Sequence, residues 1–155
     1  MTKRYLYTIL FLFCVNFCFA QNTLFDKYAD KDNVTSVFIS KKMFQMMPSV
    51  DTPKLNLKNM KNKIESLHII TAEDKKIQEN MKNEFSALMK KDYDELMRIK
   101  DGMTKVNFYV KQKGNFISEM VMIVDSAEND FTVMQLLGNF TLKEIQEITN
   151  TMPQK

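Results

Sequence analysis

The part of the sequence that constrains the fold most strongly is residues 105–137, which predict three consecutive strands joined by short turns. Apolar residues alternate with polar ones over 105–111, as is typical of a strand with one buried face and one wet face. Residues 117–124 are apolar on both faces, which favours an interior strand. A third strand is expected over 131–137. Because short turns join strands that run in opposite directions, these segments predict an antiparallel sheet.

Three other segments can add strands to this sheet. Residues 34–39 and 64–70 are rich in β-branched and apolar side chains and are bounded by polar residues. Residues 93–100 suit either a strand or a further helical turn, and we favour the strand.

The most regular helical pattern begins at Thr71. The Thr71 hydroxyl can accept a hydrogen bond from the backbone N–H of Asp74 and would cap the helix there. Apolar side chains then recur at helical spacing at Ile77, Met81, Phe85 and Leu88.

Two short helices are expected near the start of the folded part. Residues 24–29 can form one helical turn with its apolar side chains on one side. Ser40 can cap a second helix, which Pro48 ends. The inward-facing side chains of these two helices would be Leu24, Phe25 and Tyr28 in the first and Met43, Phe44 and Met47 in the second.

Residues 49–62 are polar and carry several lysines without an intervening acid. They predict a mobile loop or a frayed helix. A run of like charges of this kind is usually only solvated. Its charge could also meet an acidic partner or lipid headgroups.

The last helix is expected after Gly138 and Asn139, which should end the third strand. Thr141 and Glu144 form a capping box, and Phe140 is placed to pack onto Ile145. The buried stripe of this helix would be Leu142, Ile145 and Ile148. Antiparallel strands with helices before and after them predict an α+β domain, with one antiparallel-rich sheet and helices packed mainly on one face.

The N-terminus predicts a cleaved signal peptide. Lys3 and Arg4 precede a short apolar run, and the small side chains of Cys18 and Ala20 fit a signal peptidase site before Gln21. The apolar run is too short to serve comfortably as a membrane anchor. We therefore expect residues 1–20 to be a signal peptide and 21–155 a single α+β domain, located in the periplasm or secreted.

Cleavage would remove both cysteines. Each follows a phenylalanine, Phe13 or Phe17, whereas lipid attachment needs a small residue before the cysteine, so a lipoprotein is disfavoured. The remaining 135 of 155 residues could form neither a disulfide nor a thiolate metal site. Lys3 and Arg4 leave as well, so 20 basic residues face 19 acidic ones, which argues against a nucleic-acid partner. No other segment is long enough to insert stably into a membrane.

Catalytic chemistry has little support in the sequence. His68 is the single histidine, and no zinc-binding or Gly-x-Ser-x-Gly motif accompanies it. Carboxylates are plentiful, but no pair stands out as the acid and base of a glycosidase. The sequence therefore designates no catalytic residue, cofactor-binding residue or metal ligand. A hydrolase that uses a carboxylate pair to act on glycans is the alternative to a non-enzymatic domain.

Methionine is unusually frequent, with 13 residues. Met43, Met46 and Met47 place thioethers at helical spacing, and thioethers are suitable ligands for Cu(I), so copper handling is a further alternative. Packing of an irregular core is the favoured reading. It rests on the methionines scattered through the expected core elements, Met81, Met97, Met120, Met122 and Met134.

The short run Asp125-Ser126-Ala127 lies in an expected turn. It resembles the acceptor sequence for O-glycosylation of exported Bacteroidota proteins. Ser126 is therefore a candidate modification site.

Several segments together resemble one family. They are residues 25–28, 34–44, 93–97, 106–110, 117–124 and 138–145. The chain resembles the uncharacterised exported Bacteroidota proteins of the family "domain of unknown function 4252" over nearly the whole expected domain. The resemblance implies an envelope location and transfers no catalytic residue. We expect a non-enzymatic domain that binds an envelope protein or a glycan through its sheet or through residues 49–62, and the sequence leaves the oligomeric state open.

Overall fold

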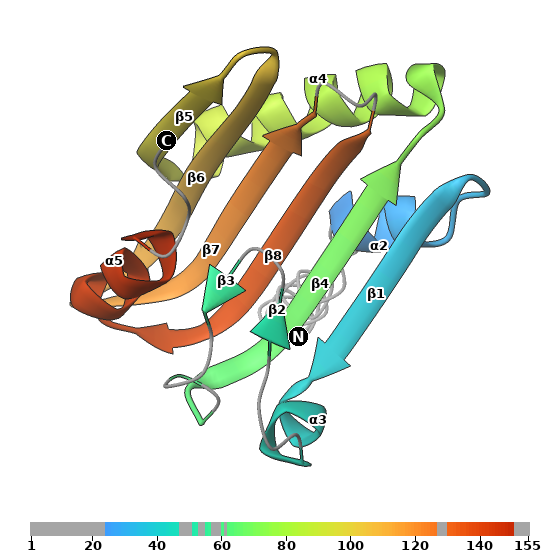
Figure 1. Cartoon of the computed structure of the whole chain (residues 1–155). Helices are drawn as coiled ribbons and strands as arrows, with labels where there is room; N and C mark the ends of the chain where they lie inside the picture. Colours follow the sequence, from blue (N-terminus) through green and yellow to red (C-terminus); the bar gives the residue numbers. More distant parts are fainter. Residues whose placement is uncertain are drawn as a thin grey trace, which may run out of the picture.

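The computed structural model describes residues 24–46, 51–52, 55–56, 60, 62–126 and 130–150. Its centre is a six-stranded antiparallel sheet in the order β1-β4-β8-β7-β6-β5 (Figure 1). The strands of this sheet are β1 (Val34–Ser40), β4 (Ile64–Ala72), β5 (Asp94–Asp101), β6 (Thr104–Lys113), β7 (Phe116–Asp125) and β8 (Phe131–Phe140). The helices are α2 (Leu24–Ala29), α3 (Lys41–Met46), α4 (Lys75–Asp92) and α5 (Leu142–Asn150). The α+β class and the antiparallel main sheet are as the sequence predicts.

The expected strands are present, and the favoured reading of residues 93–100 is confirmed by β5. The segment that is apolar on both faces becomes β7, which lies between β8 and β6. Met120, Val121 and Met122 of β7 are all buried, because both faces of an interior strand are covered.

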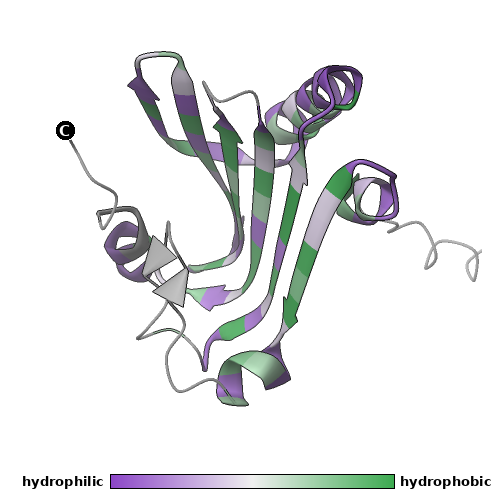
Figure 2. Cartoon of the chain, turned by 45° about the vertical axis from the view of Figure 1, so that its right-hand side comes forward, coloured by the Kyte–Doolittle hydropathy of each residue, from purple (hydrophilic) through white to green (hydrophobic). Residues whose placement is uncertain are grey.

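Each face of the sheet carries its own apolar cluster. Figure 2 views the sheet from its side, with α4 and α2 against one face and α5 at the other. Buried side chains of α2 and α4 pack with Ile70, Val121 and Val133 on the first face. Phe44 of α3 and Ile145 of α5 pack with Phe108 and Leu136 on the second. The expected one-sided packing thus holds for α2 and α4, whereas α3 and α5 contribute to the other face.

The predicted cap of α4 is wrong by one turn. Thr71 lies in β4, where its hydroxyl is 3.0 Å from that of Thr132 in β8. Asp74 is the N-cap instead, and its Oδ1 accepts a hydrogen bond from the backbone N–H of Ile77 at 3.0 Å. The ladder with β1 and β8 extends through Ala72, so the pairing of β4 delays the start of the helix.

Two side chains that were expected to face inward are exposed. Met43 is 47% exposed, because α3 is only six residues long and buries a single side chain, Phe44. Leu142 is 49% exposed at the first position of α5, and Ile145 is the buried residue of that helix. Met47 and the side chain of Ile148 lie outside the described residues.

The region of residues 49–62 contains strands where a loop or a helix was expected. β2 (Asp51–Thr52) pairs with β3 (Leu55–Asn56) in antiparallel register. Met60 is buried in the same cluster as Ile145. The remaining residues of this region, except Asn62, lie outside the described residues.

Gly138 was expected to end the third strand, but β8 continues through Phe140. A Cβ atom at Gly138 would overlap the carbonyl oxygen of Lys63 and the ring of Phe140. Next to it, the backbone N–H of Asn139 donates to that carbonyl oxygen at 3.2 Å, beside an irregularity in the β4–β8 register. Glycine is therefore needed here for the close approach of two strands.

Replacing Gly138 with alanine should lower the free energy of unfolding by about 1–3 kcal/mol, because the new methyl group collides with backbone that cannot move freely. Urea denaturation monitored by circular dichroism measures the change. Asn139→Ala at the neighbouring exposed position is the control and should leave the midpoint nearly unchanged.

Candidate functional site

The border of the sheet formed by β1 is the first notable surface. β1 pairs with β4 without irregularity, from Val34 opposite Ala72 to Ser40 opposite Ser66. No residue of β1 is charged, and Phe38 and Val37 at its centre are 63% and 43% exposed. A strand with a free border presents unpaired backbone N–H and C=O groups, which can pair with another strand.

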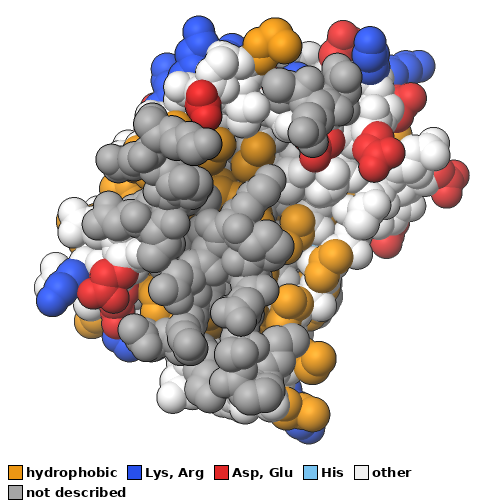
Figure 3. Space-filling view, viewed as in Figure 1, with side chains coloured by type: hydrophobic (Ala, Val, Ile, Leu, Met, Phe, Trp, Pro, Cys, Tyr) orange, Lys and Arg blue, Asp and Glu red, His pale blue; other side chains and the backbone are white. Residues whose placement is uncertain are grey.

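The apolar border continues into α3, which follows β1 directly. Met46 is 71% exposed, and Met43 is also exposed. Figure 3 shows apolar side chains along the border where Figure 1 places β1 and, below it, α3. Residues 37–46 contain four of the seven large apolar side chains that are exposed in the described part of the chain. We call Val37, Phe38, Met43 and Met46 the β1–α3 patch.

The opposite border of the sheet, formed by β5, differs from β1 in its charge and in the regularity of its pairing. β5 carries five charged residues among its eight. The register with β6 is interrupted between Glu95 and Met97. The Arg98 guanidinium donates two hydrogen bonds to the Glu95 carboxylate, from Nε at 2.9 Å and from Nη2 at 2.7 Å. Charges and bulges are the usual means by which a sheet border is protected from pairing, so β5 is protected and β1 is not.

A row of polar side chains crosses the sheet on the face covered by α2 and α4. Its members are Ser36 (β1), His68 (β4), Gln135 (β8), Glu119 (β7) and Tyr93 just before β5. The Ser36 Oγ lies 3.1 Å from the His68 Nε2. At the other end, Gln135 and Tyr93 both donate to the Oε1 of Glu119, the tyrosine hydroxyl at 2.7 Å. His68 and Gln135 are directly opposite each other in the ladder and are both buried.

The surroundings of the row shift the ionisation of two of its members. Burial lowers the pKa of His68 from its ordinary value, although the Asp26 carboxylate acts in the opposite direction. Phe25 and Phe38 lie against the imidazole ring, with centroids 5.6 and 5.7 Å away. Burial and the hydrogen bond to Glu119 raise the pKa of the Tyr93 hydroxyl. His68 and Tyr93 are therefore held in their neutral forms near neutral pH.

A hydroxyl beside an imidazole is also the geometry of a nucleophile and its base. Acyl transfer additionally needs donors aimed at the developing oxyanion. Ser36 lies within a regular strand rather than on a sharp turn, and its side chain is exposed at the border of the sheet. The contact fits a structural role best, in which Ser36 and His68 link β1 to β4 and fix the orientation of Phe38.

The His68 environment predicts a pH effect on stability. The folded pKa is below the ordinary value of 6.5, so below that pH the unfolded chain binds a proton that the folded chain does not. Stability should be greatest above about pH 7 and should fall as the pH is lowered toward about pH 5. Urea midpoints at the two pH values measure this slope.

His68→Gln is the control, because it keeps a polar side chain near Ser36 but cannot titrate. Since His68 is the single histidine of the chain, the slope between about pH 5 and about pH 7 should flatten in this variant. An equal slope in both proteins would show that His68 is not the titrating group.

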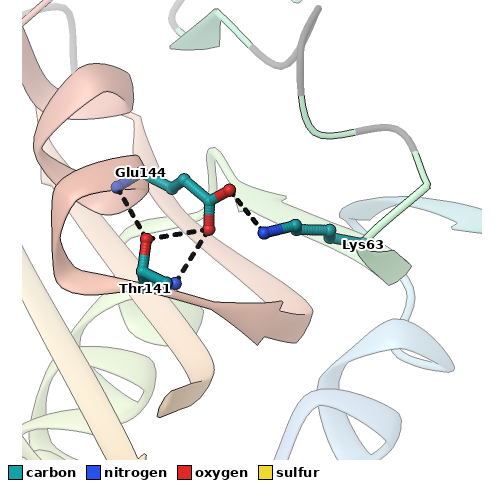
Figure 4. A network of polar contacts seen from close by, with 3 residues as sticks. All are labelled: Lys63, Thr141 and Glu144. Carbon is teal, nitrogen blue, oxygen red and sulfur yellow. Dashed lines mark hydrogen bonds and ion pairs between the residues drawn. The ribbon is translucent and has the colours of Figure 1, made fainter. Parts of the chain in front are cut away.

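The capping box of α5 is confirmed. The backbone N–H of Thr141 donates to Glu144 Oε2 at 2.9 Å, and that of Glu144 donates to Thr141 Oγ1 at 3.4 Å (Figure 4). Lys63 forms an ion pair with the other oxygen of Glu144. The Lys63 ammonium and the Thr141 N–H lower the pKa of the Glu144 carboxyl. The cap thus joins α5 to the turn before β4.

Removing the Thr141 hydroxyl should cost about 1 kcal/mol of stability. Thr141→Ser keeps the acceptor and is the matched variant, so only Thr141→Ala should lower the urea midpoint clearly. Equal losses in the two variants would assign the effect to the methyl group of threonine rather than to the cap.

A polar hollow of about 480 Å³ lies where the α2–β1 and β4–α4 connections meet. It is lined by Asn33, Val34, Thr35, Thr71, Glu73 and Asp74. Its two carboxylates are sequence neighbours, and Asp74 is already engaged as the cap of α4. A glycosidase pair instead faces the scissile bond from two sides. This hollow therefore gives the hydrolase alternative no support.

The other sequence-based candidates lie apart from one another. Ser126 follows β7, and its backbone N–H donates to the Asp130 carbonyl oxygen at 3.1 Å, whereas residues 127–129 lie outside the described residues. Glycosylation of Ser126 stays a prediction. Met43 and Met46 are accessible, so their part in copper handling also stays a prediction. The scattered methionines are core residues as expected, with Met97 partly buried and the others buried: Met81, Met120, Met122 and Met134.

Sequence reasoning missed both the exposure of β1 and the polar row. The row joins residues from five separate segments, so no local spacing could reveal it. The lack of charge in residues 34–40 was a usable signal for the exposure of β1, because a strand at the edge of a sheet normally carries charged side chains. That signal becomes specific only when the strand order is known.

Among the described residues, no group of three or more His, Cys, Asp or Glu side chains is placed to hold a metal ion. The helices in those same ranges include none with the length and apolarity needed to cross a membrane.

Comparison with known proteins identifies one relationship. No curated protein and no solved structure gives a significant match to the chain. The family model described as a domain of unknown function, number 4252, matches residues 28–148. This match runs from the end of α2 into α5 and so includes the whole six-stranded sheet. The chain belongs to the family of domain of unknown function 4252.

Proposed function

We propose that this protein is an exported bacterial envelope domain without enzymatic activity, which binds a protein partner through the β1–α3 patch. The observation that carries the proposal is the concentration of exposed apolar side chains in residues 37–46. Val37 and Phe38 point to opposite faces of the sheet, so the patch surrounds the outer border of β1 and continues onto α3. Exposed apolar side chains that gather in one region are typical of interaction sites, whereas single ones are common everywhere.

Export is supported by the sequence of the first twenty residues. Lys3 and Arg4, the apolar run and the small residues Cys18 and Ala20 follow the order of a cleavable signal peptide. These residues lie outside the described part of the structure. The domain would then act in the periplasm or outside the cell.

A protein partner fits this surface better than a glycan. Sugar hydroxyls require a matching set of hydrogen-bonding side chains, whereas the β1–α3 patch consists of one aliphatic, one aromatic and two thioether side chains. Methionine adapts its shape to different apolar partners, which also suits a protein interface. In the part of the chain that the structure describes, no strand pairs with the outer border of β1, so its backbone can supply donors and acceptors for an added strand.

Photo-crosslinking in the producing bacterium tests the proposal. A photoreactive phenylalanine analogue is introduced at position 38 or 43 of the full chain, and cells are irradiated before extraction. Both positions should give a discrete adduct of higher mass. Met103 is the matched control, because it is 78% exposed and lies in the β5–β6 turn at the opposite border.

Adducts of equal yield from position 103, or none from 38 and 43, would contradict binding at the patch. An adduct that is sensitive to glycosidase would replace the protein partner by a glycan. Intact mass of the same material tests export separately: the chain should begin at Gln21, and retention of Cys14 or Cys18 with added acyl mass would overturn the soluble product.

A further inference from the structure

We infer that the partner of the β1 border is a second copy of this chain, joined by antiparallel pairing of β1 with β1 about a two-fold axis. This inference rests on the proposed function, since it names the partner of the same surface. It is supported by the regular pairing of β1, by the charges that flank β1 and by the charged, irregular strand β5 at the opposite border.

The two-fold axis is fixed by the length of β1. Seven residues can all pair with a second copy in antiparallel register when the axis passes through Val37. Val37 then faces the partner's Val37, and Ser36 lies opposite Phe38 of the partner subunit. Because β1 contains no charged residue, this pairing places no like charges opposite each other.

The flanks of β1 are complementary in charge. Asp30 and Asp32 precede the strand, and Lys41 and Lys42 follow it; all four are exposed. Asp30 and Asp32 lie in the turn before β1, and Lys41 and Lys42 begin α3, so antiparallel pairing about Val37 brings the acidic flank of one copy near the basic flank of the other. The intervening Lys31 is turned back toward the ring of Tyr28, with its Nζ 5.8 Å from the ring centroid. A parallel arrangement would instead oppose acid to acid and base to base.

Apolar contact would reinforce the backbone pairing on both faces of the joined sheet. Val37 lies opposite Ile69 of β4 and Phe38 lies opposite His68, so their side chains point to different faces. On one face, Val37 of each copy meets the other at the axis. On the other face, the edge-on contact of Phe38 with His68 orients the ring.

Charge-swap variants at the axis test the inference by sedimentation equilibrium of the processed full chain. The wild-type protein should show a concentration-dependent dimer. Val37→Lys and Val37→Glu each place like charges at the axis and should weaken the dimer by about tenfold or more, whereas an equimolar mixture should restore it as a heterodimer. Met103→Lys at the opposite border is the matched control and should dimerise as the wild type does.

Restoration by mixing shows that the single variants are folded and that position 37 of one copy faces position 37 of the other. A wild-type protein that stays monomeric at every concentration, or single variants that dimerise normally, would overturn the inference. So would a mixture that fails to restore the dimer. If position 38 crosslinks to a different protein while the wild type is monomeric, the proposed function stands and the second copy is excluded.

Discussion

Replacing Phe85 with alanine should lower the free energy of unfolding by about 3–5 kcal/mol. Phe85 is fully buried in α4, and its ring packs edge-on against Phe25 of α2 at a centroid distance of 5.1 Å. The ring of Tyr28 lies on another side of it, 6.0 Å away. Loss of the ring leaves a cavity between the two helices and the sheet, which the surrounding side chains can fill only in part.

Phe116→Ala is the matched control for this variant. The chemical change is the same, but Phe116 is 47% exposed at the start of β7, so little apolar surface returns to water. Urea denaturation should therefore give a far larger decrease for Phe85→Ala. Similar decreases for both variants would show that α4 is not docked on the sheet as described.

Replacing Ile145 with alanine should lower the free energy of unfolding by about 2–5 kcal/mol. Ile145 is fully buried in the cluster that contains Phe108, Val110 and Phe140, on the face opposite α4. The loss removes the buried side chain by which α5 is held to the sheet in the described part of the helix. A domain of this size is stabilised by only about 5–15 kcal/mol, so the fraction unfolded should rise measurably.

Leu142→Ala provides an isomeric control within the same helix. Leu142 is 49% exposed, so its truncation should change the urea midpoint only slightly. If Ile145→Ala and Leu142→Ala both leave the midpoint unchanged, α5 is not part of the scaffold. It would then be a second candidate for the partner-binding element.

Stretches in which a local pattern repeats were predictable. The alternation of apolar and polar residues in β6 and the apolar run on both faces of β7 predicted these strands correctly. Successive side chains of a strand point to opposite faces, so the sequence pattern shows which faces are buried. The capping box at Thr141 and Glu144 was also correct, since both of its hydrogen bonds lie within four residues. Neighbouring residues carry all the information in these cases.

The errors occur where distant segments decide the outcome. Thr71 has the chemistry of a helix cap, but pairing of β4 with β1 and β8 keeps it in a strand. Gly138 has the chemistry of a strand end, but the close approach of Lys63 makes it a position where two strands touch. Met43 lies at the spacing of an inward residue, yet α3 sits at the margin of the sheet.

The sequence by itself determined the α+β class, the six strands of the main sheet, the long helix α4 and the family of the chain. These follow from short-range periodicity and from a pattern that extends along the chain. Tertiary structure alone decided that β1 is a border strand, that β5 is the opposite one and that Ser36, His68, Gln135, Glu119 and Tyr93 form one row. The physical reason is that strand order is set by contacts between residues far apart in the sequence, so the same apolar strand can be an interior strand or an exposed border. For this protein, that choice determines which surface is available to a partner.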